Sequence, residues 1–140
     1  MYTSFFMKMQ PPTITQQEHR IGKSKGGRPY IYEPAELKDA REKLTAYLSQ
    51  HRPPRKLQGP VKLEVNWFFY NPKVQALFAW KTKKPDTDNL NKMLKDCMTR
   101  LEYWEDDAQV VYECIQKVDT SNKDEAGIYI EIMELDTREV

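Results

Sequence analysis

Two groups of acidic residues, separated by a helical pattern, are the residues of this chain best suited to chemistry. Asp86 and Asp88 are separated by one residue, Lys92 stands four positions after Asp88, and the pair Asp106 and Asp107 follows the helical pattern. Three carboxylates brought to one point repel one another unless a cation holds them, and hard oxygen ligands suit Mg²⁺ or Mn²⁺. The spacing therefore predicts a metal and phosphate site if Asp107 folds back towards Asp86 and Asp88.

Each of these residues also has a simpler explanation. Asp88 is a good N-cap for a helix that begins at Asn89, the pair Asp106 and Asp107 suits a turn, and Lys92 suits a solvated helix face. For each residue alone the simpler explanation is favoured. The combination is harder to explain in this way, because a cap does not need Asp86 and a turn does not need two acids aimed at the same helix end.

The helical pattern between the acids has one apolar face, because its apolar residues recur at steps of three and four. These residues are Leu90, Met93, Leu94, Cys97, Met98 and Leu101. The opposite face carries Asp88, Lys92, Lys95, Asp96 and Thr99, so Lys92 lies one turn from Asp88 and points the same way. Residues 109–118 are rich in β-formers and predict a strand with Asp106 and Asp107 at its entrance.

The remaining pattern predicts an α+β domain spanning residues 1–140. Strands are expected at residues 2–9, 59–70, 109–118 and 127–133, and helices at residues 34–50 and from Asn89 onwards. Pro34 is expected at the first helical position, and residues 73–84 are expected to form a connecting loop. The order β-α-β-α-β-β indicates two helices packed on a mixed, largely antiparallel sheet.

Charge is unevenly distributed along the chain. Residues 1–85 hold 16 Lys and Arg against six Asp and Glu, whereas residues 86–140 hold six against 15. A basic first half suits a phosphate backbone while the acidic second half gathers metal, although pairing of the two halves within one fold explains most of these charges equally well. Residues 16–28 predict a mobile basic loop that contacts DNA or, alternatively, only aids solubility. The cations expected at DNA are Arg20, Lys23, Lys25, Arg28, Lys81, Lys83 and Lys84.

Composition argues for a protein of the cytoplasm. No apolar run approaches the length of a membrane span, and residues 1–10 lack the charged and apolar regions of a signal peptide. Cys97 and Cys114 have no metal-binding spacing, so we expect both to be reduced thiols in the core.

The segment from Lys84 to Lys92 reads Lys-Pro-Asp-Thr-Asp-Asn-Leu-Asn-Lys, Asp96 follows four residues later, and residues 106–111 read Asp-Asp-Ala-Gln-Val-Val. This combination closely resembles the RusA-type Holliday junction resolvases, because order, spacing and chemistry all agree. The match is strong over about a quarter of the chain. A looser similarity to the region before the first helix of RusA-like proteins begins at Gly27.

The resemblance implies a site and an activity. Asp86, Asp88 and Asp107 would be the metal-binding catalytic carboxylates, Lys92 the basic residue of the site, and Mg²⁺ the cofactor, with Mn²⁺ as its substitute. The implied enzyme is a RusA-like homodimer that resolves four-way DNA junctions by paired symmetric nicks, in DNA recombination and repair. Asp96 and Asp106 also match family positions and are expected to support the site.

Three other functions remain open on the sequence alone. A metal-dependent nuclease for other branched DNA, such as flaps, would need the same ligands. A non-catalytic module that binds branched DNA would keep the basic residues without the chemistry. A sugar-nucleotide enzyme using Asp-x-Asp would need a nucleotide-binding βαβ unit, which the pattern does not show.

Overall fold

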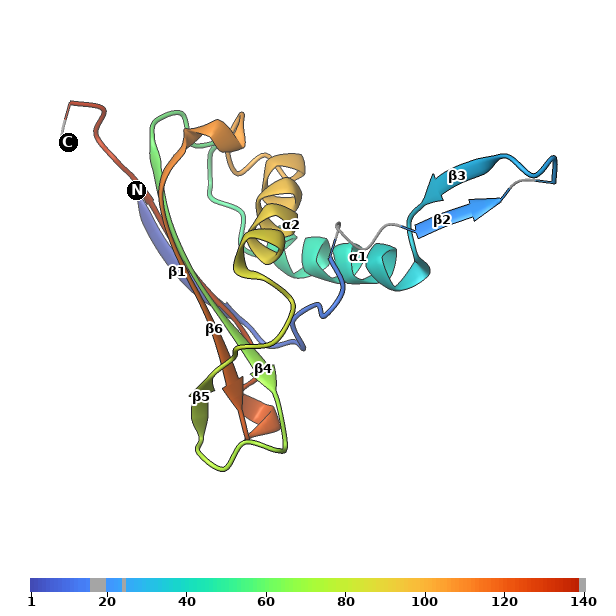
Figure 1. Ribbon diagram of the computed structural model, residues 1–140. Helices are drawn as coiled ribbons and strands as arrows, with labels where there is room; N and C mark the ends of the chain where they lie inside the picture. Colours follow the sequence, from blue (N-terminus) through green and yellow to red (C-terminus); the bar gives the residue numbers. More distant parts are fainter. Residues whose placement is uncertain (16–19, 24, 139–140) are drawn as a thin grey trace.

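A computed structural model describes residues 1–15, 20–23 and 25–138 of the chain (Figure 1). Its strands are β1 (Tyr2–Met7), β2 (Arg20–Lys23), β3 (Pro29–Tyr32), β4 (Val61–Tyr70), β5 (Phe78–Trp80), β6 (Val110–Thr120) and β7 (Gly127–Glu134). Its helices are α1 (Ala35–Ser49) and α2 (Thr87–Arg100), with short 3-10 turns η2 (Asp107–Gln109) and η3 (Lys123–Glu125).

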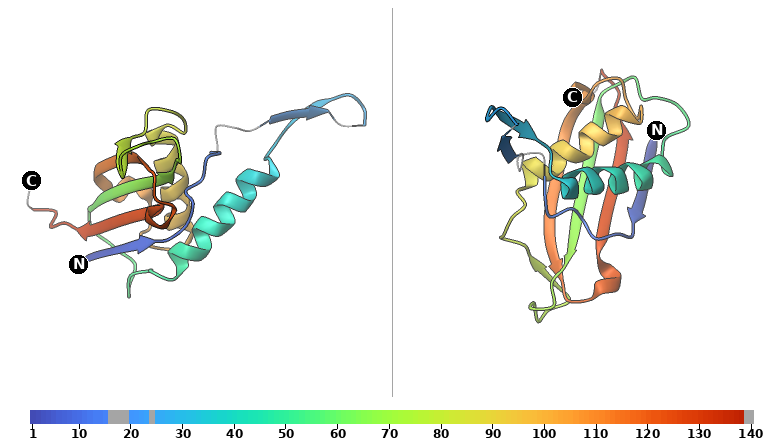
Figure 2. Two further views of the ribbon diagram at one scale, coloured as in Figure 1. Left: turned by 90° about the horizontal axis from the view of Figure 1, so that it is seen from below. Right: turned by 90° about the vertical axis from the view of Figure 1, so that its right-hand side faces the viewer.

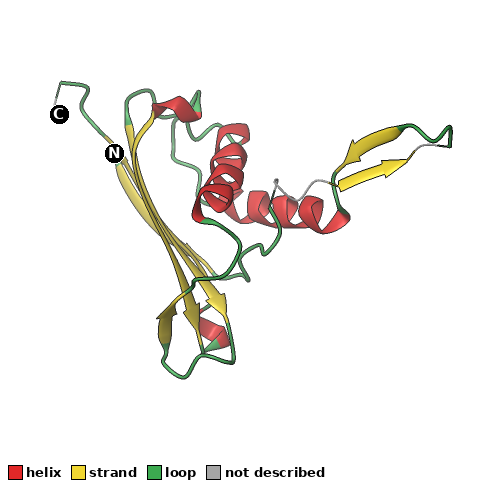
Figure 3. Ribbon diagram, viewed as in Figure 1, coloured by secondary structure: helices red, strands yellow, loops and turns green. Residues whose placement is uncertain are grey.

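The main sheet has five strands in the order β1-β7-β4-β6-β5. Strands β4 and β6 are parallel, and the other three neighbouring pairs are antiparallel. A parallel pair needs a long crossover connection, and α2 lies within the connection from β4 to β6. The expected α+β class, with two helices on a mixed and largely antiparallel sheet, is confirmed (Figure 3).

Both helices cover the same face of the sheet (Figure 2). Strand β4 alternates as expected, and its inward residues are buried: Val61, Leu63, Val65, Trp67 and Phe69. The apolar face of α2 is buried from Leu90 to Met98, and Leu37, Leu44 and Leu48 of α1 complete the layer. Since α2 is packed by its apolar face, its polar face is left free to line a site.

Two elements differ from the sequence prediction. Within the expected mobile loop at residues 16–28, β2 forms an antiparallel hairpin with β3, and Gly27 in its turn has a φ of 78° that suits glycine. The hairpin extends away from the sheet beyond the start of α1 (Figures 1 and 2). The expected loop at 73–84 contains β5, a three-residue edge strand paired with β6.

The two cysteines lie in different environments. Cys97 is buried in α2, as expected, whereas Cys114 is exposed on β6, so the prediction of a core position is wrong for Cys114. The pairing register explains this difference, since Cys114 lies opposite Glu64 on the sheet face that the helices leave uncovered. Over the described ranges, no helix has the length and apolar character needed to cross a membrane.

Candidate active site

The start of α2 places the first two acids. Asp86, not Asp88, is the N-cap residue, with an extended backbone at ψ 152°, and its exposed side chain makes no capping hydrogen bond. The expected capping role of Asp88 is therefore wrong. Asp88 lies in the first helical turn, where a negative charge is favoured by the helix dipole.

The loop before Asp86 is held by a lysine from the sheet. Lys117 of β6 donates hydrogen bonds from Nζ to the backbone oxygens of Lys83 and Pro85, each at 2.9 Å. Pro85 is itself buried. Strand β6 therefore fixes the point from which Asp86 and the helix begin.

We expect Lys117→Met to release this loop. The variant loses two charge-assisted hydrogen bonds and leaves two carbonyls less well satisfied, so its free energy of unfolding should fall by about 1–2 kcal/mol. Cutting of a DNA substrate should fall by about 10-fold or more, because small misplacements of reacting groups are costly. Urea unfolding and a cutting assay measure both effects, with Lys73→Met in the exposed turn after β4 as the control. Normal cutting by Lys117→Met would show that the loop does not depend on this contact.

The second acidic group is held by a capping box. Asp106 accepts a hydrogen bond from the Ala108 amide, and Gln109 Oε1 accepts from the amides of Glu105 and Asp106 at 2.8 and 3.1 Å. Asp106 therefore caps the turn that carries Asp107, and its support of the site stays a prediction. The capping box fixes the backbone of Asp107, because residues on both sides of it are held by hydrogen bonds.

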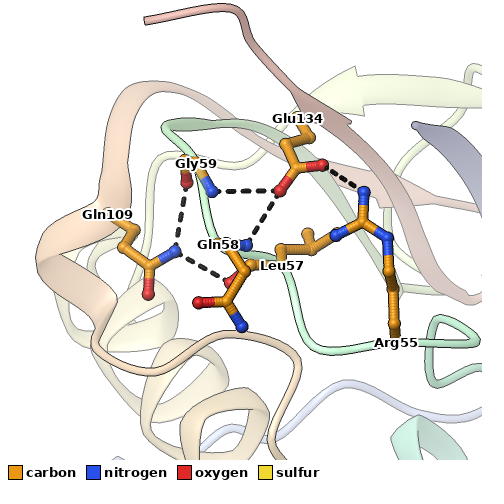
Figure 4. Close-up of polar contacts among 6 residues, drawn as sticks. All are labelled: Arg55, Leu57, Gln58, Gly59, Gln109 and Glu134. Carbon is orange, nitrogen blue, oxygen red and sulfur yellow. Dashed lines mark hydrogen bonds and ion pairs between the residues drawn. The ribbon is translucent and has the colours of Figure 1, made fainter.

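The other end of the Gln109 side chain fastens this turn to the loop before β4 (Figure 4). Its Nε2 donates to the backbone oxygens of Leu57 and Gly59 at 3.0 and 3.1 Å. The same loop is held from β7 by Glu134, which accepts from the amides of Gln58 and Gly59. The Gly59 amide is the main cause that lowers the pKa of Glu134, so this carboxylate stays ionised in its anchoring role.

Replacing Gln109 should therefore disturb Asp107 without touching it. Gln109→Ala removes four hydrogen bonds, and we expect it to lower the free energy of unfolding by about 2 kcal/mol and to slow cutting. Gln109→Glu keeps the acceptor but cannot donate to Leu57 and Gly59, so it should also slow cutting. The control is Gln116→Ala, at an exposed position of β6. If both variants lose stability but cut at the normal rate, Gln109 does not position Asp107.

A pocket of about 380 Å³ lies where α2, η2 and β6 meet. Its lining residues are Thr87, Asp88, Asn91, Lys92, Lys95, Asp107, Glu113 and Ile115. The structure thus brings together three of the predicted residues, Asp88, Lys92 and Asp107, from two separate segments. Asp86 stands just before Thr87 but does not line the pocket.

The three predicted acids and the predicted lysine are free to take ligands. Within the described part of the chain, the carboxylates of Asp86, Asp88 and Asp107 accept no hydrogen bond and form no ion pair. Lys92 is exposed and likewise forms no ion pair with any residue that the structure describes. The carboxylates are thus available to a cation, and the lysine beside them is available to the phosphate oxygens of a substrate.

The donor set also fits a hard divalent cation. The pocket offers the carboxylates of Asp88 and Asp107, and the Oδ1 atom of Asn91 is buried with no hydrogen-bond partner among the described residues. No three acidic, histidine or cysteine side chains in the described ranges are grouped so as to enclose a metal ion. Mg²⁺ does not need such a cage, because it commonly uses one or two carboxylates, keeps several waters and takes its other ligands from phosphate.

The cations predicted to contact DNA are found in different surroundings. Lys81 differs from the expectation, since its side chain is only 14% exposed and Nζ lies 3.3 Å from Asp119. Lys83 and Lys84 are exposed in the loop that precedes α2, and Lys25 and Arg28 are exposed near the hairpin turn. The side chains of Arg20 and Lys23 lie outside the described part of the structure.

Five residues of the site were missed from sequence. Asn91 and Lys95 lie three and seven positions after Asp88, which places them on one helix stripe, and this spacing was the available signal. In the pairing of β6 with β4, Glu113 lies opposite Leu63 and Lys117 lies opposite Trp67, and both of these β4 residues are buried. Glu113 and Lys117 are therefore charged residues on the sheet face that the helices cover. Gln109 completes an Asp-x-x-Gln pattern typical of a capping box.

Comparison with known proteins agrees with these features. Residues 10–133 match the family Endodeoxyribonuclease RusA. The chain is 34% identical over 137 residues to the crossover junction endodeoxyribonuclease rusA of Lactococcus phage r1t, covering 96% of this chain and all of that protein. It is also 33% identical over 101 residues to YqaN of Bacillus subtilis, an uncharacterised protein, covering 64% of this chain and 70% of YqaN. This chain belongs to the RusA family of endodeoxyribonucleases.

Proposed function

We propose that this nuclease resolves Holliday junctions by paired symmetric nicks, in DNA recombination and repair. The observation that carries the proposal is the pocket that joins Asp88 and Lys92 of α2 to Asp107 of η2. The similarity to a phage crossover junction endodeoxyribonuclease over nearly the whole chain supports the choice of a four-way junction as substrate.

We assign Asp86, Asp88 and Asp107 as the residues that hold a divalent cation, Mg²⁺ or in its place Mn²⁺. When bound, the cation supplies Lewis acidity towards water and the scissile phosphate. Lys92 places an ammonium group at the same pocket and stabilises the charge that develops on the phosphate oxygens during hydrolysis. Gln109 and Lys117 hold the two backbone segments that deliver these acids.

We assign the exposed cations outside the pocket to the DNA backbone. Lys83 and Lys84 precede Pro85 and Asp86, and Lys25 and Arg28 lie in the connection between β2 and β3. Contacts of this kind position a duplex without reading its sequence. Lys81 is left out of this set because Asp119 already engages it.

A four-way junction has two strands to cut, which calls for two equivalent sites related by a two-fold axis. We therefore propose that the protein acts as a homodimer, and light scattering after size-exclusion chromatography tests this. The two free cysteines fit a reducing compartment, and we propose the cytoplasm as the location.

The test of function is a cutting assay with three synthetic DNA substrates. Purified protein is incubated with a mobile four-way junction, a flap and a linear duplex, each with and without Mg²⁺. Symmetric nicks on the junction alone, only with Mg²⁺, are the expected result. Preferred cutting of the flap would identify a nuclease for other branched DNA, and binding without any cutting would identify a non-catalytic module.

A further inference from the structure

A second lysine faces the pocket, one turn of α2 beyond Lys92. Lys95 is a lining residue, and its side chain is 20% exposed. Residues three positions apart on an α-helix are neighbours on its surface, about 4.5 Å apart along the helix axis. Lys92 and Lys95 therefore offer two neighbouring positive charges to one DNA backbone.

The direction of Lys95 is fixed by an acid from the neighbouring strand. Its Nζ donates to Glu113 Oε1 at 2.5 Å. Glu113 is itself held on its other side, because Oε2 accepts a hydrogen bond of 2.6 Å from Nδ2 of Asn91. Asn91 is 2% exposed, so one end of this chain of contacts is anchored in the interior.

In this arrangement the ammonium group of Lys95 can still bind a further ligand. An ammonium group has three donors, and Glu113 is its one side-chain partner within the part of the chain that the structure describes. A long lysine side chain loses rotamer freedom when it binds an anion, and the ion pair with Glu113 has already removed much of that freedom. The charge is thus aimed at the pocket before any substrate arrives.

We propose that Lys95 is a second phosphate-binding cation of this site, and that Glu113 and Asn91 are the positioning residues that hold it. The inference rests on the proposed nuclease function, because it assigns Lys95 to the DNA backbone beside the phosphate that is cut. A purely structural alternative makes Lys95 and Glu113 an ion pair that only joins α2 to β6.

The salt dependence of DNA binding separates these two roles. Affinity is measured over a range of NaCl concentrations in EDTA, on a four-way junction and a linear duplex, so that the DNA stays intact. Each phosphate contact contributes about 0.9 to the slope of log affinity against log salt. We expect Lys95→Met to bind every DNA more weakly and to lower that slope by about 0.9. Lys95→Arg and Glu113→Gln keep the cation and should keep the slope.

Two further variants make the result decisive. The double variant Lys95→Met with Glu113→Gln removes both charges of this ion pair, so neither partner is left as an unpaired charge. It therefore guards against loss of folding, and it should show the same lower slope. Lys123→Met removes an exposed lysine of η3, beyond the far end of β6 from the pocket, and controls for the change in net charge.

An unchanged slope in Lys95→Met, or equal losses of binding in Lys95→Met and Glu113→Gln, would overturn the proposal. Cutting of the four-way junction by the unmodified protein is assayed separately. A protein that cuts the junction while Lys95→Met keeps the full slope refutes the role of Lys95 alone. A protein that binds DNA but does not cut it refutes the proposed function instead.

Discussion

The Asp88→Asn protein should bind a four-way junction at least as tightly as the unmodified protein and cut it at least about 100-fold more slowly, as expected when one charge-stabilising group is lost. Asparagine keeps the size of the side chain but removes the negative charge that holds a cation. Asp88 accepts no hydrogen bond from the residues that the structure describes, so the substitution removes no contact on which folding depends. Binding should persist because the variant carries one negative charge fewer and therefore repels the DNA phosphates less strongly.

The same comparison can be made for Asp107→Asn, and the two variants should behave alike because both residues line one pocket. Asp39→Asn, at an exposed position of α1, serves as the matched control and should cut normally. Thermal unfolding of all three variants checks that none is destabilised. Cutting at the normal rate by either pocket variant would remove that residue from the site, and normal cutting by both would refute the assignment of the pocket.

Chelation of divalent cations should stop cutting completely while junction binding remains. EDTA removes the cation that Asp88 and Asp107 are assigned to hold, and the hydrolysis of an unactivated phosphodiester is very slow without it. The exposed cations that contact the DNA backbone are unaffected. Added Mg²⁺ or Mn²⁺ should restore cutting, and electrophoretic mobility shift and nicking assays on one preparation measure both properties.

A structural role for the ion would give a different result. The fold has a buried core formed by both helices and the sheet, and we expect this core to hold the fold together without the ion. EDTA should therefore leave the unfolding temperature of the protein unchanged. Loss of cutting together with a large fall in that temperature would mean that the cation stabilises the fold, and cutting that persists in EDTA would contradict metal-dependent chemistry.

The large elements could be predicted because their burial pattern is local. The period-two alternation of β4 and the apolar face of α2 are each written in consecutive residues, and both lie in the structure as expected. The hairpin of β2 and β3 was missed because residues 16–28 are polar and rich in glycine, a composition typical of loops.

The start of α2 was placed two residues too late for a different reason. Asp86 and Asp88 are equally good capping residues, so a local rule cannot decide between them. The decision depends on Lys117, which is distant in sequence and holds the carbonyls of Lys83 and Pro85. Glu113 was missed for the same reason, since its partners Asn91 and Lys95 are defined only by the packing of α2 on β6.

The crossover from β4 through α2 to β6 determines when the pocket can form during synthesis of the chain. Asp88 and Lys92 belong to the middle of the crossover, and Asp107 belongs to its end. A nascent chain on the ribosome, or a fragment that stops before residue 107, carries only five of the eight residues that line the pocket. The pocket is therefore completed only after residue 107 has been synthesised and β6 has docked beside β4.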